Sequence, residues 1–475
     1  MKVLFLNSRA SLMYPMEKLG IMILSSLLKQ EGHECENIEP EAVPDLIEVV
    51  RQRDPQLIAF SSTTGLHTVY LELARNLKKA FPHIPTIMGG PHPTFMPHVI
   101  EHPAMDIICL GEGEMALLEL ANAMEAGRDY RDIRNLWVKQ NGDITRNDLR
   151  PFLSGAELDA LPFPDRELMA VHADVYKNGT NSVMSGRGCP YKCSYCFNER
   201  AQEMAGGRYT RKMSIDRVIA EIQDMIQRCG TRMVAFQDDV LIMNKRWFKE
   251  FAPRYRDEVG LPYVCHITID LVDEEIAEAL AISNCKYACY GLENGNEEFR
   301  HKMLNKKNSN EEVITGSHFL KQYGVKIITQ NMIGFPEETP EITLDTARLN
   351  VEAMTDIANF YFFTPYPGTW AGDYCRDAGL LSAPFEDFPV SLHDMPPLDS
   401  PYASDFKELS QLIYLGMDYP SLLPLMRYVY TRLDRNSIVR KLAVKAFFAL
   451  NKNIRSWPYF KNRPSTIPRG IENLA

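Results

Sequence analysis

Short apolar runs alternate with amphipathic stretches along the first part of the chain. The apolar runs, rich in β-branched residues, predict strands, and apolar positions at helical spacing between them predict helices. Strands that are apolar throughout and separated by helices are typical of a parallel sheet covered on both faces. We therefore predict a doubly wound α/β domain over residues 1–125. The predicted strands are 3–7, 57–62, 85–90 and 106–114, and the helices include 21–32 and 68–81.

A second series of strands and helices occupies residues 176–380. Six parallel strands with crossover helices indicate a full or partial α/β barrel, whose active site lies at the carboxyl ends of the strands. Residues 126–175 are polar and contain several prolines, so we interpret them as a connector. The stretch 381–475 predicts a mainly helical region. The barrel strands are expected near 182–186, 233–237, 263–269, 286–292, 325–334 and 358–366.

The length of 475 residues, with 45% hydrophobic and 24% charged residues, predicts about three globular domains. This mix excludes disorder of the whole chain. The net charge of −10 argues against general binding to nucleic acid. The first apolar run is too short for a signal peptide, and no run approaches the roughly 20 apolar residues that span a bilayer. The expected compartment is the cytoplasm.

Three of the ten cysteines cluster in SGRGCPYKCSYCFNE (185–199), just after the first predicted barrel strand. Cys189, Cys193 and Cys196 have C-x3-C-x2-C spacing, and thiolates suit zinc or iron–sulfur clusters. Structural zinc normally takes four ligands, and no fourth follows at finger spacing. Three thiolates satisfy three irons of a 4Fe–4S cluster and leave the fourth open to a ligand. The alternatives are incidental thiols and a zinc site that borrows a distant ligand.

The cysteine spacing, with Tyr195 before the last cysteine, resembles the radical S-adenosylmethionine (SAM) superfamily. The resemblance implies that the open iron chelates the amino and carboxylate groups of SAM. Reduction of the cluster then cleaves SAM to a 5′-deoxyadenosyl radical. Tyr195 is expected to contact the adenine through its backbone.

Other strand-end segments extend this resemblance over roughly 180–380. It implies that FQDD (236–239) meets the SAM amino group, that the acid of GLENGN (291–296) meets the ribose, and that NMIGFPEET (331–339) supports the adenine. Each segment also has a plain interpretation as a turn, a helix cap or a surface loop. One departure is Thr268, where related proteins often carry arginine. The implied SAM residues are Tyr195, Gln237, Asp238, Asp239, Glu293, Asn331 and Gly334.

Cys285 and Cys289 also stand four residues apart, but inside a predicted strand. The period of two predicts that their side chains share one face. We therefore interpret them as core thiols rather than as a second cluster.

A flavodoxin-like domain ahead of such a barrel resembles the cobalamin-binding subclass of radical SAM enzymes. The D-x-H-x-x-G cobalt-ligand motif of methionine synthase-like proteins is missing from the first loop, SRASLMYP, which implies cobalamin without a protein histidine ligand. His92 either touches the cobalamin tail or caps a turn. The alternative for the whole domain is a fold that no longer binds cobalamin. The implied cobalamin residues are Ser61, Thr63, Gly89, Gly90, His92, Gly111, Glu112 and Gly113.

The segment YFFTPYPGTW (361–370) resembles the sixth-strand segment of anaerobic magnesium-protoporphyrin ester cyclases and their hopanoid-modifying relatives. This implies that Thr364 and Tyr366 contact the substrate at the open end of the barrel. The alternative is an aromatic core strand that ends in a Pro-Gly turn.

From residue 420 onward, 11 Lys and Arg stand against 2 Asp and Glu. The segment 436–460 predicts a helix with an apolar stripe through Ile438, Leu442, Ala443, Ala446, Phe447 and Leu450, followed by Trp457, Tyr459 and Phe460. Such a basic amphipathic helix either packs on the barrel with its lysines in solvent or contacts an anionic membrane peripherally.

Together the resemblances imply a cobalamin-dependent radical SAM enzyme with three cofactors: a 4Fe–4S cluster, SAM and cobalamin. The expected reaction functionalises an unactivated C–H bond of an apolar small molecule by methyl transfer. A reducing partner such as flavodoxin or ferredoxin is expected to supply electrons. The alternatives are cyclisation, oxidation or rearrangement without methyl transfer, and a cobalamin or redox sensor that is not an enzyme.

Overall fold

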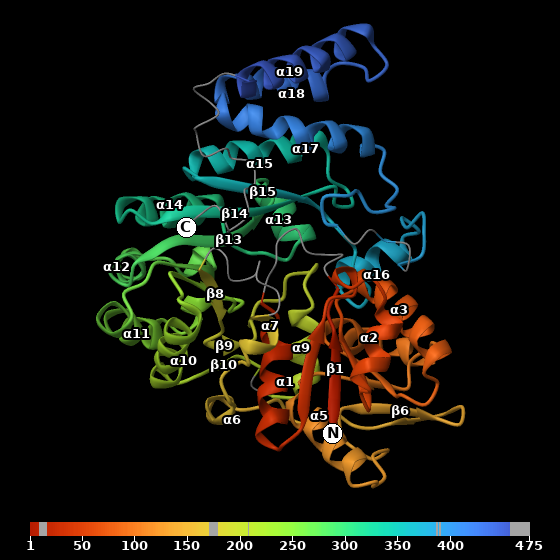
Figure 1. Ribbon diagram of the computed structural model, residues 1–475. Coiled ribbons are helices and arrows are strands. Elements are labelled where there is room, and N and C mark those ends of the chain that lie inside the picture. Colours follow the sequence, from red (N-terminus) through yellow and green to blue (C-terminus); the bar gives the residue numbers. More distant parts are fainter. Residues whose placement is uncertain (9–16, 171–178, 208, 386–387, 389–390, 457–475) are drawn as a thin grey trace.

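The computed structural model describes residues 1–8, 17–170, 179–207, 209–385, 388 and 391–456. A seven-stranded sheet organises the first part of the chain, in the order β2-β1-β3-β4-β5-β6-β7 (Figure 1). The first five of these strands are parallel, and the last two are antiparallel. The strands are β1 (Lys2–Leu6), β2 (Glu34–Ile38), β3 (Leu57–Ser61), β4 (Thr86–Gly89), β5 (Ile107–Cys109), β6 (Leu136–Gln140) and β7 (Asp143–Arg146).

Helices cover both faces of this sheet, as the doubly wound fold predicts. One face packs on α1 and α5, and the other packs on α2 and α3. The helices are α1 (Leu19–Gln30), α2 (Leu46–Arg53), α3 (Leu66–Ala80), α4 (Pro91–Phe95) and α5 (Glu114–Glu125).

Two features of this sheet were not predicted. Strand β2 has the sequence ECENI and lies at the edge of the sheet. An edge strand tolerates such alternating glutamates, so the sequence shows no continuous apolar run to predict it. Strands β6 and β7 lie in the stretch 126–175 that we interpreted as a connector, and they extend the sheet as a hairpin. The rest of that stretch includes two short helices, α6 (Gly155–Ala160) and α7 (Glu167–Ala170).

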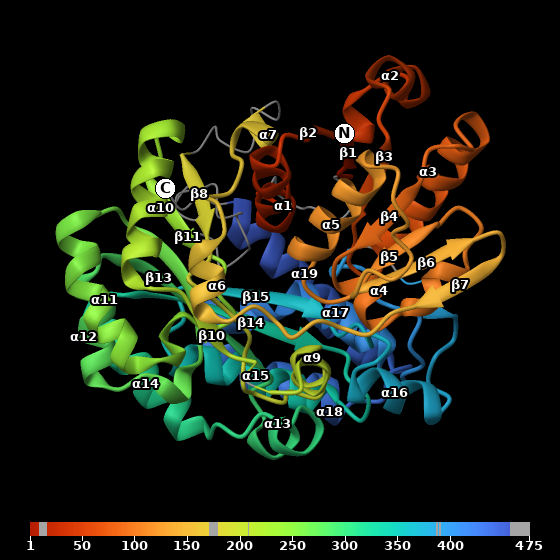
Figure 2. The ribbon, with the colours of Figure 1, turned by 90° about the horizontal axis from the view of Figure 1, so that it is seen from below.

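A second sheet of six strands, all parallel, runs in the order β15-β14-β13-β12-β11-β8. Because β8 and β15 are its two edges, the sheet is a partial barrel, and Figure 2 shows it beside the first sheet. The strands are β8 (Thr180–Val183), β11 (Met233–Phe236), β12 (Tyr263–Ile267), β13 (Cys285–Glu293), β14 (Lys326–Ile333) and β15 (Ile357–Phe362).

Helices connect the barrel strands and follow the last one. The apolar faces of α10, α11, α12, α14 and α15 share one core with the outer face of the sheet, whereas α13 and α16 pack in a second cluster. The helices are α10 (Ile215–Cys229), α11 (Lys245–Glu258), α12 (Glu274–Ile282), α13 (Glu297–Met303), α14 (Asn310–Gln322), α15 (Pro340–Glu352) and α16 (Trp370–Asp377).

The prediction that Cys285 and Cys289 share one face of their strand is wrong. The register against β12 shifts between Tyr263 and Val264, so β13 carries an extra residue at Lys286. Such a bulge reverses the alternation of side chains. Cys285 therefore packs among the helices, 3.9 Å from the sulfur of Cys265, whereas Cys289 faces the barrel interior. Both are buried free thiols, as the core interpretation predicts.

Three helices form the end of the described chain: α17 (Ala403–Asp418), α18 (Leu423–Thr431) and α19 (Ile438–Ser456). Figure 1 shows them stacked beyond β15, at the far end from the first sheet. The predicted stripe of α19 is only partly buried: Phe447 packs inward, but Ile438 and Leu442 are 75% and 60% exposed. Arg440 is buried and pairs with Asp405. Trp457, Tyr459 and Phe460 lie outside the described residues.

Buried charges join the two halves of the chain. Arg166 donates 2.6 Å to Glu17, just before α1, and 2.9 Å to the carbonyl of Ser182 in β8. A two-stranded ribbon, β9 (Gly186–Arg187) with β10 (Arg211–Lys212), rises from the barrel beside helix α9 (Asn198–Ala205). Within the described residues no helix is long and apolar enough to cross a membrane.

Candidate active site

The three clustered cysteines lie in the loop that follows β9, at the carboxyl ends of the barrel strands. Burial raises the pKa of the Cys189 thiol to about 12 and that of Cys196 to about 11, and it also raises the pKa of Cys193. Each pKa also responds to the charge of a neighbouring cysteine or acid, so the thiols share one environment. Metal binding to these cysteines must therefore release their protons.

Within the described ranges, no three His, Cys, Asp or Glu side chains converge as ligands of a single metal ion. A 4Fe–4S cluster does not require such convergence, because its three thiolates bind three different irons.

Tyr195 and Glu293 meet beside the cysteines. Their side chains are hydrogen-bonded, and burial raises the pKa of both. Glu293 has a φ of 66°, a conformation that costs a non-glycine residue energy and clusters at functional sites. The structure thus holds the predicted ribose acid next to the cysteine loop.

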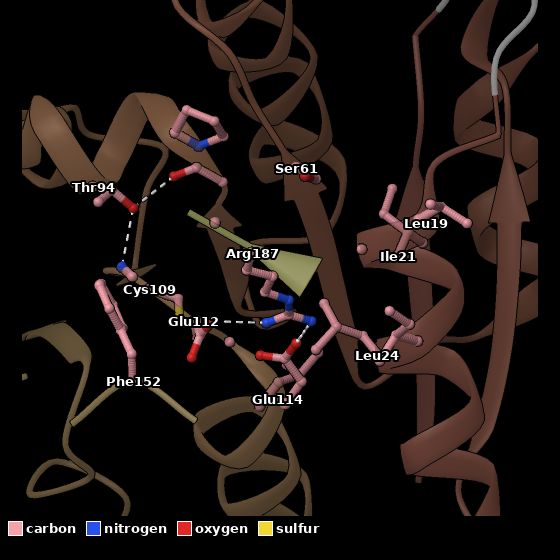
Figure 3. A pocket seen from close by; sticks show the side chains of 18 of the residues that line it. Leu19, Ile21, Leu24, Ser61, Thr94, Cys109, Glu112, Glu114, Phe152 and Arg187 are labelled. Atoms are coloured by element: carbon pink, nitrogen blue, oxygen red, sulfur yellow. Dashed lines mark hydrogen bonds and ion pairs between the residues drawn. The ribbon is translucent and has the colours of Figure 1, made fainter. Parts of the chain in front are cut away.

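A cavity of about 490 Å³ lies between the two sheets (Figure 3). Its apolar wall comes from α1, with Leu19 and Leu24 among the lining side chains. The loops after β3, β4 and β5 form the opposite wall, and Gln237 and Asp239 of the barrel also line it. The cavity therefore joins the strand ends of one sheet to those of the other, where ligands of α/β folds bind. Of the predicted cobalamin residues, those that line it are Ser61, Gly89, Gly90, Gly111, Glu112 and Gly113.

Thr63 and His92 are not among the lining residues. His92 is buried, its ring stacks on His67 at 3.7 Å, and it is hydrogen-bonded to Thr64 at 3.1 Å. Burial lowers the pKa of His92 to about 3, so the ring is neutral. Thr63 accepts a hydrogen bond from the amide of His67 in the first turn of α3. Both residues therefore stabilise the loops after β3 and β4 and do not line the cavity.

Two arginines and two glutamates form an ion-pair cluster at the edge of the cavity, and Figure 3 shows Arg187 with its two glutamates. Arg187 donates 2.8 Å to Glu112 and 2.6 Å to Glu114, and Arg211 donates 2.7 Å to Glu112. Burial alone lowers the pKa of Arg187, but the carboxylates of Glu114 and Glu112 raise it overall. We name this set the junction cluster. It fixes the strand-end loops of the first sheet against the ribbon that leads to Cys189.

Besides Tyr195 and Glu293, five predicted SAM residues remain, of which two face the cavity and three support the surrounding structure. Gln237 and Asp239 face the cavity. Asp238 accepts hydrogen bonds from the amide and hydroxyl of Ser185 and from Lys212, so it ties β11 to the ribbon. Asn331 is buried in a network with Thr329 and Asn350, and the amide of Gly334 donates to Glu338. These three build the frame of the site.

Aromatic rings close one side of the site. Phe95 lines the cavity and stacks on Phe197 of the cysteine loop at 4.4 Å, and Tyr366 lies 5.6 Å from Phe197. Thr364, at the end of β15, is 8% exposed. Tyr366 thus stands where the first sheet, the cysteine loop and the sixth barrel strand meet. Such a wall can exclude water from a reaction at the strand ends.

Sequence reasoning missed two charged residues of the site, Arg187 and Arg211. They are separated from Glu112 by 75 and 99 positions, so no local pattern connects them.

Two known protein families match separate parts of the chain. Residues 8–121 match the B12 binding domain, and residues 183–349 match the radical SAM superfamily. The chain belongs to the cobalamin-binding radical SAM family. It is therefore a radical SAM enzyme, whose cofactors are a 4Fe–4S cluster, SAM and cobalamin, and the sensor alternative is set aside.

Relatives in this family include an uncharacterized methyltransferase of Pyrococcus horikoshii. It is 28% identical over 76% of this chain and 79% of its own length. An anaerobic magnesium-protoporphyrin IX monomethyl ester cyclase of Rubrivivax gelatinosus is 26% identical over 61% of this chain. The match covers 53% of that cyclase, so this chain spans about half of it.

Two solved structures share the fold. TsrM, a radical SAM methyltransferase from Kitasatospora setae with bound cobalamin and a [4Fe-4S] cluster, aligns with a TM-score of 0.66 at 19% identity. The alignment covers 81% of this chain and 79% of TsrM. OxsB, a cobalamin-dependent radical SAM enzyme, aligns with a TM-score of 0.70 at 13% identity over 95% of this chain and 71% of OxsB.

The residues present fit the three cofactors. The cysteine loop offers three grouped thiols with a buried acid and a tyrosine beside them. Glycines at the ends of β4 and β5 line the cavity, and a Cβ on Gly90 would lie 2.9 Å from the backbone of Ser62. Gly90 therefore lets the loop lie close to its neighbour and leaves backbone free to face a large ligand.

Proposed function

We propose that this enzyme methylates an unactivated carbon of a small, largely apolar molecule, with cobalamin as the methyl carrier. One observation carries the proposal: the cavity between the sheets is lined both by the strand-end loops of the B12 domain and by Gln237 and Asp239 of the barrel. Cobalamin bound in this cavity would lie next to Gln237 and Asp239, two of the residues predicted to bind SAM.

The chain positions the reactants, places charged groups around them and excludes water from the site. When bound, the cofactors supply an electron, a hydrogen-abstracting radical and a methyl group. Cys189, Cys193 and Cys196 hold the cluster, and Glu293 orients SAM through the ribose. The wall of Phe95, Phe197 and Tyr366 excludes water, and Thr364 and Tyr366 contact the substrate.

The reaction has a definite balance. One substrate C–H bond, two SAM molecules and two electrons from a flavodoxin or ferredoxin give the methylated substrate, 5′-deoxyadenosine, methionine and S-adenosylhomocysteine. The first measurement is cobalamin retention after anaerobic loading with iron, sulfide and hydroxocobalamin. We expect about one cobalamin per chain, followed by a 14-dalton gain in a converted substrate. Retained cobalamin without any methylated product would contradict the proposal.

The cyclase relatives support a second candidate, a radical cyclisation or oxidation without methyl transfer. The product mass separates the two reactions, because cyclisation or oxidation leaves no 14-dalton gain. The SAM products separate them as well. Both reactions form 5′-deoxyadenosine and methionine, but only methyl transfer also forms S-adenosylhomocysteine.

The outer face of α19 supports a peripheral contact with an anionic membrane. Ile438, Val439 and Leu442 are all more than half exposed, and the neighbouring Lys441 and Lys445 are exposed as well. Apolar side chains flanked by lysines are complementary to anionic lipid. Such docking would bring the enzyme to apolar substrates that dissolve in the membrane.

We expect the protein to float with vesicles that contain anionic lipid and not with neutral vesicles. Leu442→Asp should weaken this binding about ten-fold or more. It removes apolar area that the lipid would bury, and it adds a negative charge. Ile282→Asp, at an exposed apolar position on α12, is the matched control. Equal flotation of the wild type and Leu442→Asp would contradict membrane docking, as would self-association through this face.

A further inference from the structure

Three separate segments of the chain meet at Ser194 in the cysteine loop. The amide of Ser194 donates to the carbonyl of Leu304 at 3.0 Å, and its hydroxyl donates to the carbonyl of Met303, at the end of α13, at 2.7 Å. The carbonyl of Ser194 accepts from the amide of Ala371, in the first turn of α16, at 2.9 Å. The end of α13 and the start of α16 therefore pack directly on the cysteine loop.

Exposed lysines stand where these segments meet. Lys192 and Lys307 are both exposed, and Asn305 joins their segments, because it donates to the carbonyl of Lys192 at 2.7 Å. Lys307 donates to a neutral group, the carbonyl of His301, at 3.0 Å. In the described part of the chain neither lysine pairs with an acid within 4 Å. The two lysines therefore give this surface a local positive charge.

Trp370 belongs to the same surface, because the next residue binds the cysteine loop. Its side chain is 50% exposed and stacks on the ring of Tyr374, with 5.3 Å between the ring centroids. The hydroxyl of Tyr374 donates to Glu337 at 2.8 Å, which holds the pair of rings in place. Fixed, exposed tryptophans are typical anchors of protein interfaces. We name Lys192, Lys307 and Trp370 the outer patch.

The charge of the outer patch is opposite to that of the chain. The chain carries a net charge of −10, so as a whole it repels an acidic partner, whereas exposed lysines attract one. The patch also adjoins Cys193, so an electron delivered here has only the cysteine loop to cross before it reaches the cluster. Small interfaces with complementary charge are typical of electron-transfer encounters.

We propose that the outer patch docks a small acidic flavoprotein of the flavodoxin type, which reduces the cluster. The lysines attract its acidic surface, and the indole of Trp370 packs against the flat, apolar edge of the flavin. Each encounter passes one electron, so the fully reduced flavin is oxidised by one electron and the cluster is reduced by one. The inference rests on the electron demand of the proposed function, and it does not depend on methyl transfer.

The test compares two reductants on the same anaerobically reconstituted protein. Formation of 5′-deoxyadenosine is measured with purified flavodoxin, kept reduced by NADPH and its reductase, and separately with excess dithionite, which needs no docking surface. Lys192→Glu combined with Lys307→Glu should lower the flavodoxin-driven rate about ten-fold or more at low ionic strength. The dithionite-driven rate and the iron content per chain should stay nearly unchanged.

Added salt should narrow the gap between this double variant and the wild type, because it screens the charges. Trp370→Ala should slow the flavodoxin-driven reaction several-fold at every salt concentration. Lys79→Glu is the matched control, because it reverses the charge of an exposed lysine in the last turn of α3, and it should keep both rates. If the double variant loses iron, each single lysine variant replaces it in the same comparison.

The assignment is overturned if the lysine variants keep the full flavodoxin-driven rate, or if they lose both rates at full iron content. It is also overturned if the loss appears only with a purified ferredoxin as the donor. A wild type that forms 5′-deoxyadenosine with flavodoxin but methylates no substrate contradicts the proposed methyl transfer and leaves the docking surface in place.

Discussion

Replacing Cys189, Cys193 or Cys196 with alanine is expected to abolish both the cluster and reductive cleavage of SAM. Each thiolate binds a separate iron, so the loss of one leaves a second iron without a protein ligand. We expect iron and sulfide content to fall to a small fraction of the wild-type value. 5′-Deoxyadenosine should fall below detection when dithionite and SAM are supplied.

Cys229→Ala is the matched control for the three variants. Cys229 is a half-buried free thiol at the end of α10, outside the cysteine loop. This variant should keep its cluster and form 5′-deoxyadenosine at the wild-type rate. Formation of 5′-deoxyadenosine by any of the three loop variants would remove the basis of the site described above.

Gly20→Trp is expected to abolish cobalamin retention while leaving the cluster intact. Gly20 lies in the first turn of α1 and lines the cavity, and a Cβ at this position would meet nothing within 4 Å. An indole here projects into a cavity of about 490 Å³ and takes up space that the corrin needs. We expect retained cobalamin, measured by absorbance after desalting, to drop to about a tenth or less of the wild-type amount.

Gly20→Ala tests whether the effect of Gly20→Trp comes from the filled cavity or from the loss of the glycine itself. Alanine fits the same open position, and it should stabilise the helix by about 0.5–1 kcal/mol relative to glycine. This variant should retain cobalamin and unfold at a slightly higher temperature. If Gly20→Trp keeps a full complement of cobalamin, the cavity between the sheets is not the cobalamin site.

The parts of the fold that could be predicted were those with local signals. Apolar runs located the parallel strands, and the C-x3-C-x2-C spacing located the cysteine loop. Strand β2 was missed because its edge position permits glutamates. The pairing of β6 with β7 was missed because a short polar hairpin resembles a loop.

Contacts between distant segments could not be predicted in the same way. The bulge at Lys286 turned Cys285 away from Cys289, and only the register against β12 reveals it. His92 sits in a glycine-rich strand-end loop that suggested a ligand contact, yet the packing of His67 decides its environment. The role of Glu112 depends on Arg187 and Arg211, which other elements supply. Sequence spacing indicates which residues are near a strand end, but packing decides where each side chain points.

The junction cluster has a consequence for how this two-part architecture can change over evolution. Removing one partner of a buried pair costs about 3–5 kcal/mol. A B12 domain exchanged from another protein would incur the same penalty unless it brought acids at the positions of Glu112 and Glu114. The two halves are therefore not interchangeable modules: new substrates can arise through changes in the barrel, while the pairing of the halves is inherited as a unit.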